Sequence, residues 1–324
     1  MLSRAEIGNL DQLASVVESV VADGPAAGCR AIDLRVWDGI DLRLLPDRGL
    51  DAGAAWYAGV PLAWISPTGE TAPIAVPRDQ DWSRGFNGGL MTTCGLRNVG
   101  VPSEGQGQHG EYHEQRATVE SIERTDGGVV TVRGRISEVD SLRFHLEVQR
   151  SWRTRVGEGR VELVDVVRNR GRETEAVPML YHVNLCAPLW SEGAELHLDA
   201  TATHPRDEAA APYADSWHRA PGVVPGAEER VFEHEVAAGP EGWAEARVRN
   251  ERLGLEVTVR WDVATMPRFW QWVQPAPGLA VLGLEPANCS VLGRAHDRAE
   301  GRLPELAPGE ERISRLEIRA SKLT

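Results

Sequence analysis

The sequence predicts an all-β protein, a large antiparallel β-sandwich with a short helix near the N-terminus. Apolar and polar residues alternate with a period of two in many short segments, as in strands that bury one face. Turn residues separate these segments about every ten residues, a spacing typical of antiparallel sandwiches and barrels. The strand–helix alternation that a parallel nucleotide-binding sheet requires is missing from the sequence.

The chain begins with helical rather than strand-like periodicity. Over residues 2–23, apolar side chains recur at intervals of three and four, which is the period of an amphipathic helix. We therefore expect a helical extension over residues 1–28. Strand-like alternation follows, and we expect residues 29–324 to form one β-sandwich domain.

Pairs of alternating segments on either side of short turns predict hairpins. The first pair covers residues 31–36 and 40–44 and flanks Asp38-Gly39, a dipeptide favoured in primed turns. Residues 205–229 lack periodicity and are expected to form a long surface loop. The other expected strands cover residues 119–124, 129–136, 142–152, 161–167, 247–249, 255–261, 279–284 and 313–318.

Composition excludes several functional classes. The 324 residues include 35 Lys and Arg against 48 Asp and Glu, a net charge of −13, whereas nucleic-acid binding needs clustered basic residues. No apolar run of about 18 residues predicts a membrane span, and the start lacks the apolar core of a signal peptide, so we expect a cytoplasmic protein. The four cysteines, Cys29, Cys94, Cys186 and Cys289, have no CxxC spacing, which predicts reduced thiols.

Three segments interrupt the alternation and concentrate polar, Gly and aromatic residues: residues 82–114, 180–185, and 269–274 with 284–288 close behind. His182 lies in an apolar run and is either a core histidine or a positioned acid. Glu285 ends an apolar strand, where a carboxylate is costly to bury without a partner, so a functional role competes evenly with a structural one. The 11 tryptophans suit sugar C–H faces as well as core packing.

A second set of polar residues raises the possibility of a metal site. His109 and His113, with Glu111 and Glu114, have the residue types and an HxxxH spacing that could ligate a metal. Four residues on a strand or loop need not converge, so a solvated loop is the alternative.

Five short motifs occur in one order along the chain. They are Asp47-Arg48-Gly49-Leu50-Asp51, Gly88-Gly89-Leu90-Met91-Thr92-Thr93-Cys94-Gly95-Leu96, His109-Gly110, Tyr181-His182-Val183-Asn184-Leu185 and Gly283-Leu284-Glu285-Pro286. Together they resemble the galactose mutarotase-like (aldose 1-epimerase) superfamily, closest to a branch of bacterial aldose 1-epimerase-like proteins. The resemblance runs from about Arg30 to the C-terminus.

The resemblance implies a β-sandwich that holds a sugar in a cleft on one concave sheet, with no cofactor and no metal. It implies that His182 is the general acid and Glu285 the general base, while His109 orients the sugar or shares the proton. Gln108 departs from the pattern, because relatives often carry an apolar residue there, which puts the role of His109 in doubt.

The chemistry of anomer exchange asks for these residue types independently. Opening a cyclic sugar requires a base at the C1 hydroxyl and an acid at the ring oxygen. Carboxylate and imidazole suit both tasks, because their reference pKa values of about 4.3 and 6.5 can be brought near neutrality by burial or pairing.

Six further residues are predicted substrate contacts: Arg48, Arg84, Asn98, Trp272, Gln274 and Asn288. The arginines could donate paired hydrogen bonds to hydroxyls or to an anionic substituent, and the indole could lie against the sugar ring. A structural role in a turn or at a sheet edge is the alternative for each. It is strongest for Arg48, because Asp47-Arg48-Gly49 could be a turn with a buried ion pair.

Three hypotheses follow. The first is a sugar mutarotase or epimerase that uses Glu285 and His182. The second is a non-catalytic carbohydrate-binding protein. The third is a metal-dependent sugar isomerase or lyase with a site built from His109, Glu111 and His113. The sequence names neither the sugar nor its charge, and no heptad or long exposed apolar strand indicates an oligomeric interface.

Overall fold

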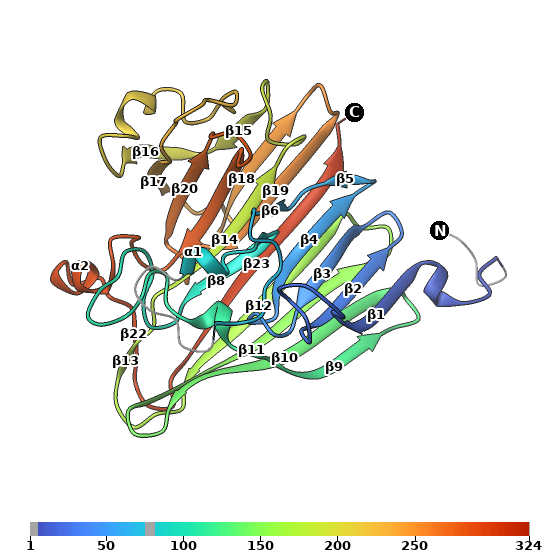
Figure 1. The fold of residues 1–324 in the computed structure, drawn as a ribbon, viewed down its shortest axis with the longest axis horizontal. Helices are drawn as coiled ribbons and strands as arrows, with labels where there is room; N and C mark the ends of the chain where they lie inside the picture. The colour runs from blue at the N-terminus through green and yellow to red at the C-terminus, as the bar shows by residue number, and fades with distance from the viewer. Residues whose placement is uncertain (1–5, 75–81, 324) are drawn as a thin grey trace.

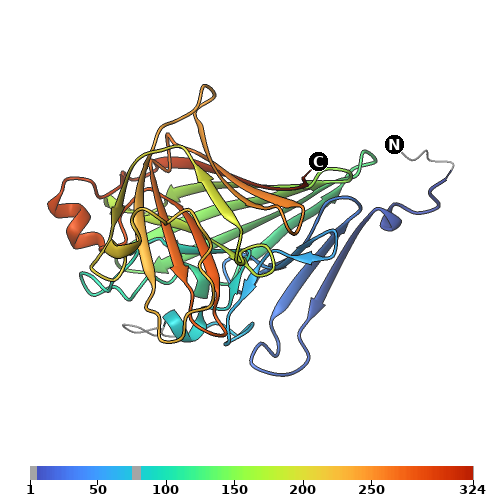
Figure 2. The same cartoon turned by 90° about the horizontal axis from the view of Figure 1, so that it is seen from above.

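The computed structural model describes residues 6–74 and 82–323, and these form two large antiparallel sheets (Figure 1). Seen from above, the two sheets face each other as two layers (Figure 2). The predicted all-β sandwich is therefore confirmed.

The first sheet has 11 strands. Their order across the sheet is β1 (Ala14–Val20), β2 (Arg30–Val36), β3 (Ile40–Leu45), β4 (Asp51–Tyr57), β8 (Met91–Gly95), β14 (Met179–Cys186), β21 (Val281–Ala287), β20 (Arg268–Gln274), β17 (Arg230–Val236) and β16 (Ala200–Pro205), with β5 (Val60–Pro61) paired to β4. Strands distant in the sequence meet at its centre, where β14 lies between β8 and β21.

The second sheet has eight strands. Their order is β15 (Glu195–Leu198), β18 (Trp243–Asn250), β19 (Leu255–Asp262), β23 (Glu311–Lys322), β12 (Arg160–Asn169), β11 (Phe144–Arg155), β10 (Val129–Asp140) and β9 (Thr118–Arg124). The predicted hairpins are present as β2 with β3, β9 with β10, β11 with β12 and β18 with β19. The period-two pattern located these strands correctly.

Short elements complete the chain. Two-stranded pairs join β6 (Trp64–Ile65) to β7 (Gly88–Gly89) and β13 (Glu175–Ala176) to β22 (Glu305–Leu306). The helices are α1 (Trp82–Gly85), α2 (Arg294–Ala299) and 3₁₀ turns at Leu10–Gln12, Tyr112–Glu114 and Ala211–Tyr213. None of the helices in the described ranges is long and apolar enough to cross a membrane.

The predicted N-terminal helix is wrong over the described residues. Residues 14–20 form strand β1, which pairs with β2 from Ala14↔Val36 to Val20↔Arg30, and only the turn at Leu10–Gln12 is helical. β-Branched valines lose side-chain freedom in a helix, and the edge of β2 offers unpaired backbone groups, so strand pairing outweighs the helical spacing. Residues 1–5 of the predicted extension lie outside the described residues.

The main core lies between the sheets, and strand alternation decides which side chains reach it. On β14, Tyr181, Val183 and Leu185 point into this core, whereas His182 and Asn184 point to the opposite face of the sheet. The polar side chains of β14 therefore lie on the outer face of the first sheet, although this strand is buried on both sides.

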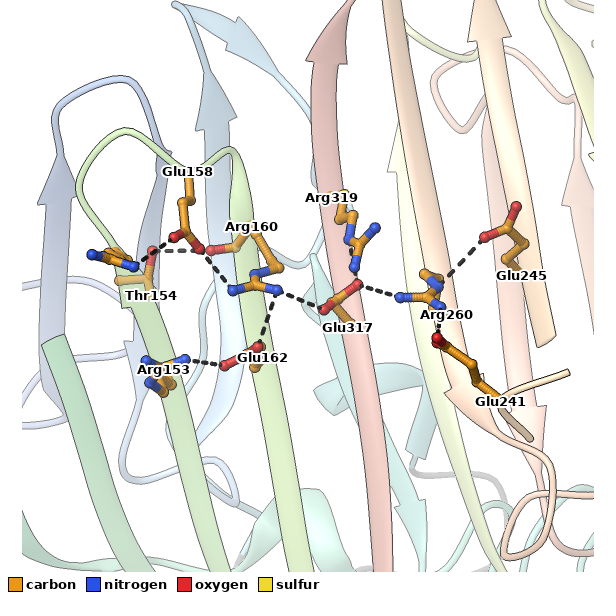
Figure 3. Close-up of polar contacts among 11 residues, drawn as sticks. Arg153, Thr154, Glu158, Arg160, Glu162, Glu241, Glu245, Arg260, Glu317 and Arg319 are labelled. Atoms are coloured by element: carbon orange, nitrogen blue, oxygen red, sulfur yellow. Dashed lines mark hydrogen bonds and ion pairs between the residues drawn. The ribbon is translucent and has the colours of Figure 1, made fainter. Parts of the chain in front are cut away.

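The outer face of the second sheet carries paired charges (Figure 3). Glu317 on β23 lies 3.4 Å from Arg160 on β12 and 3.2 Å from Arg260 on β19, so the carboxylate links three neighbouring strands. Most of the surrounding partners are partly exposed, and each such pair contributes little to stability. The cavity described next is on the other sheet.

Candidate active site

His182 and Glu285 meet on the outer face of the first sheet. β14 and β21 are antiparallel neighbours with Val183 opposite Leu284, which places His182 opposite Glu285. His182 Nε2 lies 3.1 Å from Glu285 Oε1, and the two residues are only 5% and 3% exposed. The structure thus brings together two side chains that are about a hundred positions apart in the sequence.

A cavity of about 430 Å³ opens above this pair, within the range of small-molecule sites. Aromatic rings form much of its wall, and the His182 ring centroid lies 5.2 Å from that of Phe86 and 5.4 Å from that of Trp272. The lining residues are Trp64, Ser66, Pro67, Thr68, Trp82, Ser83, Phe86, Gly100, Val101, Gln108, His109, His182, Arg206, Glu229, Val231, Trp272, Gln274, Leu279, Glu285 and Val291.

Burial changes the proton affinity of both members of the pair. It raises the pKa of Glu285 to about 8, with a further rise from Glu229 and a partial offset by Arg206. Burial lowers the pKa of His182 to about 4, against a smaller opposite effect of the neighbouring Asn184 side chain. Between these values the pair holds a single proton, which can pass between Oε1 and Nε2.

Gly283 has no side chain, and this provides the space that Glu285 and His182 occupy. A Cβ atom at this position would lie 2.7 Å from Glu285 Oε1 and 3.1 Å from His182 Cε1. A side chain there would push against the carboxylate and the imidazole, so the absence of one keeps the cavity floor open.

His109 lines the same cavity from a loop. Its ring lies tilted against Trp82 at a centroid distance of 4.4 Å and 6.4 Å from the His182 ring. Its backbone is left-handed, with φ of 57°, a conformation that is uncommon outside glycine and recurs at functional sites. Burial, with lesser effects of His182 and His113, holds the pKa of His109 well below its usual value, so the ring is neutral at pH 7.

Two of the six predicted substrate contacts line the cavity. Trp272 and Gln274 both lie on β20, and the indole Nε1 of Trp272 donates to Glu229 Oε2 over 2.8 Å. Arg84 is exposed on α1 and is not among the lining residues.

The structure places three other predicted contacts, Arg48, Asn98 and Asn288, away from the cavity lining, where they serve the backbone. Arg48 pairs with Glu114 at 2.6 Å and donates to Gly85 O, the buried ion pair that its turn motif suggested. The amides of Asn98 and Asn288 bond backbone groups of nearby loops and strands. Buried polar side chains of this kind satisfy backbone groups that the sheets leave unpaired.

Sequence reasoning missed the charged wall of the cavity. Arg206 Nη2 donates to Glu229 Oε1 over 2.8 Å, and Arg206 Nε donates to Asp207 over 2.7 Å. Both lining residues stand at the ends of residues 205–229, which were expected to form a surface loop. A loop without periodicity gives no signal about the side chains that turn back over a sheet.

The donors expected for a metal do not converge. Among the described residues, no group of three or more His, Cys, Asp or Glu side chains is placed to hold a metal ion. His109 packs against Trp82, while His113 lies 2.9 Å from Glu114 in the buried cluster that contains Arg48. The four cysteines are free thiols, and three are buried, as expected.

A family model described as "Domain of unknown function (DUF4432)" matches residues 26–320. The chain belongs to this family. No curated protein matches the chain.

Solved structures share its fold. A protein from Klebsiella pneumoniae that is provisionally named an aldose 1-epimerase superposes with a TM-score of 0.87 at 22% identity, covering 94% of this chain and 83% of that one. A galactose mutarotase-like protein from Clostridium acetobutylicum gives 0.70 at 12% identity, covering 96% and 100%. A galactose 1-epimerase from Lactobacillus acidophilus gives 0.61 at 11% identity, covering 96% and 100%. The fold is therefore the galactose mutarotase-like sandwich that the motifs predicted.

Proposed function

We propose that this protein is a mutarotase that interconverts the anomers of an aldose by acid–base ring opening. The observation that carries the proposal is the contact of His182 with Glu285, 3.1 Å apart on the floor of a cavity of small-molecule size. The fold shared with epimerases and mutarotase-like proteins supports it.

In the reacting state Glu285 is a carboxylate and His182 an imidazolium. Burial favours the uncharged forms at rest, so a proton transfer from Oε1 to Nε2 generates the reactive pair. Glu285 then takes the proton of the C1 hydroxyl while the bond from C1 to the ring oxygen breaks, and His182 Nε2 gives its proton to that oxygen.

The products of this step are an open-chain aldehyde, protonated Glu285 and neutral His182, so protons and electrons balance. Rotation about the C1–C2 bond presents the other face of the carbonyl. The same transfers in reverse close the ring to the second anomer and restore the pair.

The cavity walls suit an uncharged sugar. Arg206 is the one arginine among the described lining residues, and its guanidinium is already paired with Glu229 and Asp207. A substrate anion would meet two carboxylates beside one cation, whereas sugar hydroxyls can both donate to Glu229 and accept from Arg206. Trp272 and Phe86 offer flat apolar surfaces to the sugar C–H groups.

Anomer exchange spectroscopy by NMR tests the proposal. A panel of aldoses, uronates and sugar phosphates is added to the protein, and the exchange rate of each is compared with the uncatalysed rate. We expect acceleration for uncharged aldoses and a loss of about 10²- to 10⁴-fold in Glu285→Gln.

The matched control is Glu162→Gln, which changes a partly exposed carboxylate on the outer face of the second sheet. It should retain full activity. Undiminished exchange in Glu285→Gln would rule out the assigned base, and faster turnover of uronates would rule out the uncharged substrate.

A non-catalytic sugar receptor is the second candidate, favoured by one observation. Four aromatic residues, Trp64, Trp82, Phe86 and Trp272, line the cavity, and stacking on a sugar needs no proton transfer. Calorimetric binding of an aldose without any acceleration of its anomer exchange would select this candidate.

A further inference from the structure

Asn184 is the polar neighbour of His182 on the outer face of β14. It lies two residues further along the strand and is fully buried. Its Nδ2 donates to the carbonyl of Gly89 over 3.1 Å and to the carbonyl of His182 itself over 2.9 Å. Because both partners can only accept, the orientation of the amide is fixed, with Oδ1 directed away from these carbonyls.

The oxygen of this amide lacks a conventional partner. Among the described residues, neither Asn184 Oδ1 nor His182 Nδ1 has a hydrogen-bond partner, and both atoms are buried. One is an acceptor and the other a ring nitrogen that can carry a proton. The amide is close enough to raise the pKa of the imidazole against the effect of burial.

Other buried asparagines of the chain behave differently. The Oδ1 atoms of Asn98, Asn250 and Asn288 accept from the backbone N–H groups of Arg294, Leu253 and Met179. These three amides therefore satisfy main-chain groups on both sides. Asn184 satisfies main-chain carbonyls with its nitrogen only, and its oxygen accepts from no described backbone N–H group.

We propose that Asn184 is a positioning residue that holds the His182 ring with its proton on Nδ1, so that Nε2 faces Glu285. The role of this residue in catalysis rests on the proposed function, whereas the position of the proton on the His182 ring does not depend on it. An amide oxygen cannot donate, so it selects the Nδ1–H form of the neutral ring.

The same contact matters when the ring is charged. An imidazolium carries two N–H groups, and Nε2–H faces Glu285 or the substrate oxygen. Phe86 and Trp272, which flank the ring, offer no strong acceptor to the second N–H. Asn184 Oδ1 supplies that acceptor and so stabilises the acid form that ring opening uses.

Long-range ¹⁵N–¹H NMR of the histidine rings tests the proposal on the full chain at pH 7. Signals of His182 are identified by their loss in His182→Gln. We expect the Nδ1–H pattern in the wild type and a shift toward the Nε2–H pattern in Asn184→Ala. Anomer exchange should fall about 10- to 100-fold in the same variant.

Two further variants separate positioning from folding. Asn184→Asp keeps an acceptor at this position and should restore the Nδ1–H pattern, although it loses the two hydrogen bonds to carbonyls. Asn250→Ala removes an equally buried amide far from the site and should lower stability without changing the ring signals.

The outcomes are distinct. An Nε2–H pattern in the wild type, or an unchanged Nδ1–H pattern and rate in Asn184→Ala, would overturn the assignment of Asn184. The expected ring signals in a protein that accelerates no aldose would support the positioning role and defeat the proposed function.

Discussion

Two buried clusters of ionisable groups lie against the two faces of the first sheet, and the inner one is shared with strands β11 and β12 of the second sheet. Strand β14 contributes to both, because Tyr181 points into the core between the sheets and His182 points into the cavity. Neighbouring residues of one strand thus pack in the core on one side and line the cavity on the other.

The inner cluster is centred on Arg150 and is fully satisfied. Its guanidinium bonds both oxygens of Asp165 at 2.9 and 2.7 Å, Thr93 Oγ1 at 2.8 Å, and Asp51. Tyr181 donates to Asp165 over 2.8 Å. None of the buried polar side-chain atoms in this described cluster lacks a partner.

The outer cluster, His182 with Glu285, makes fewer hydrogen bonds than the inner cluster. Glu285 Oε1 and His182 Nδ1 make no well-aligned hydrogen bond with any described group, although they are as buried as the inner charges. Burial without full bonding favours the uncharged form of each group, which raises the pKa of Glu285 and lowers that of His182. The comparison teaches that saturation of hydrogen bonds, rather than burial, separates the structural ion cluster from the pair in the cavity.

The largest expected effect comes from removing the inner charge. Arg150→Met leaves two buried carboxylates unpaired, and we expect the free energy of unfolding to fall by about 3–5 kcal/mol. Urea denaturation measures the change. Arg153→Met on the same strand removes a partly exposed partner of Glu162 and should change stability by less than about 1 kcal/mol. Equal losses in the two variants would contradict the contrast.

Replacing the buried carboxyl group of Glu285 should change stability in the opposite direction. The pKa of Glu285 is raised from 4.5 to about 8 on folding, so the wild type loses stability as the pH rises from about 4.5 to 8. We expect Glu285→Gln to be about 1–3 kcal/mol more stable than the wild type at pH 7 and equal to it at pH 4. Denaturation at both pH values measures this, and a destabilised variant at pH 7 would refute it.

The smallest expected effect is the dependence of kcat/KM on pH. The pair holds two protons below about pH 4 and none above about pH 8, and only the singly protonated form has both an acid and a base. The value of kcat/KM should form a plateau between these limits and fall about tenfold per pH unit beyond them. Exchange rates corrected for the uncatalysed reaction measure the profile. A rate that continues to rise above pH 9 would show that the pair does not control the reaction.

Much of the fold was predictable because strand alternation is a local signal. The hairpins of β2 with β3 and β9 with β10 follow from period two and from their turn residues. The failure at β1 has a tertiary cause, since the valines of residues 14–20 fit a helical spacing but pair with β2.

The site was predictable only in part. The motifs around His182 and Glu285 marked the pair that the structure brings into contact. Arg206 and Glu229 belong to a loop, and no periodic pattern in its sequence indicates that their side chains line the cavity. The amides of Asn98 and Asn288 could bind a sugar hydroxyl, but in the structure they hydrogen-bond to backbone groups that would otherwise be unpaired.

Because side chains alternate between the two faces along β14, an error in the register of this strand would exchange its core and cavity residues. A shift of this strand by one residue would turn Tyr181 and Val183 toward the cavity and bury His182 against Asp165 between the sheets. Such a molecule would keep its strand content and yet lack the acid that we propose. Under the proposed function, turnover therefore reports correct strand alignment and is sensitive to an error that circular dichroism would miss.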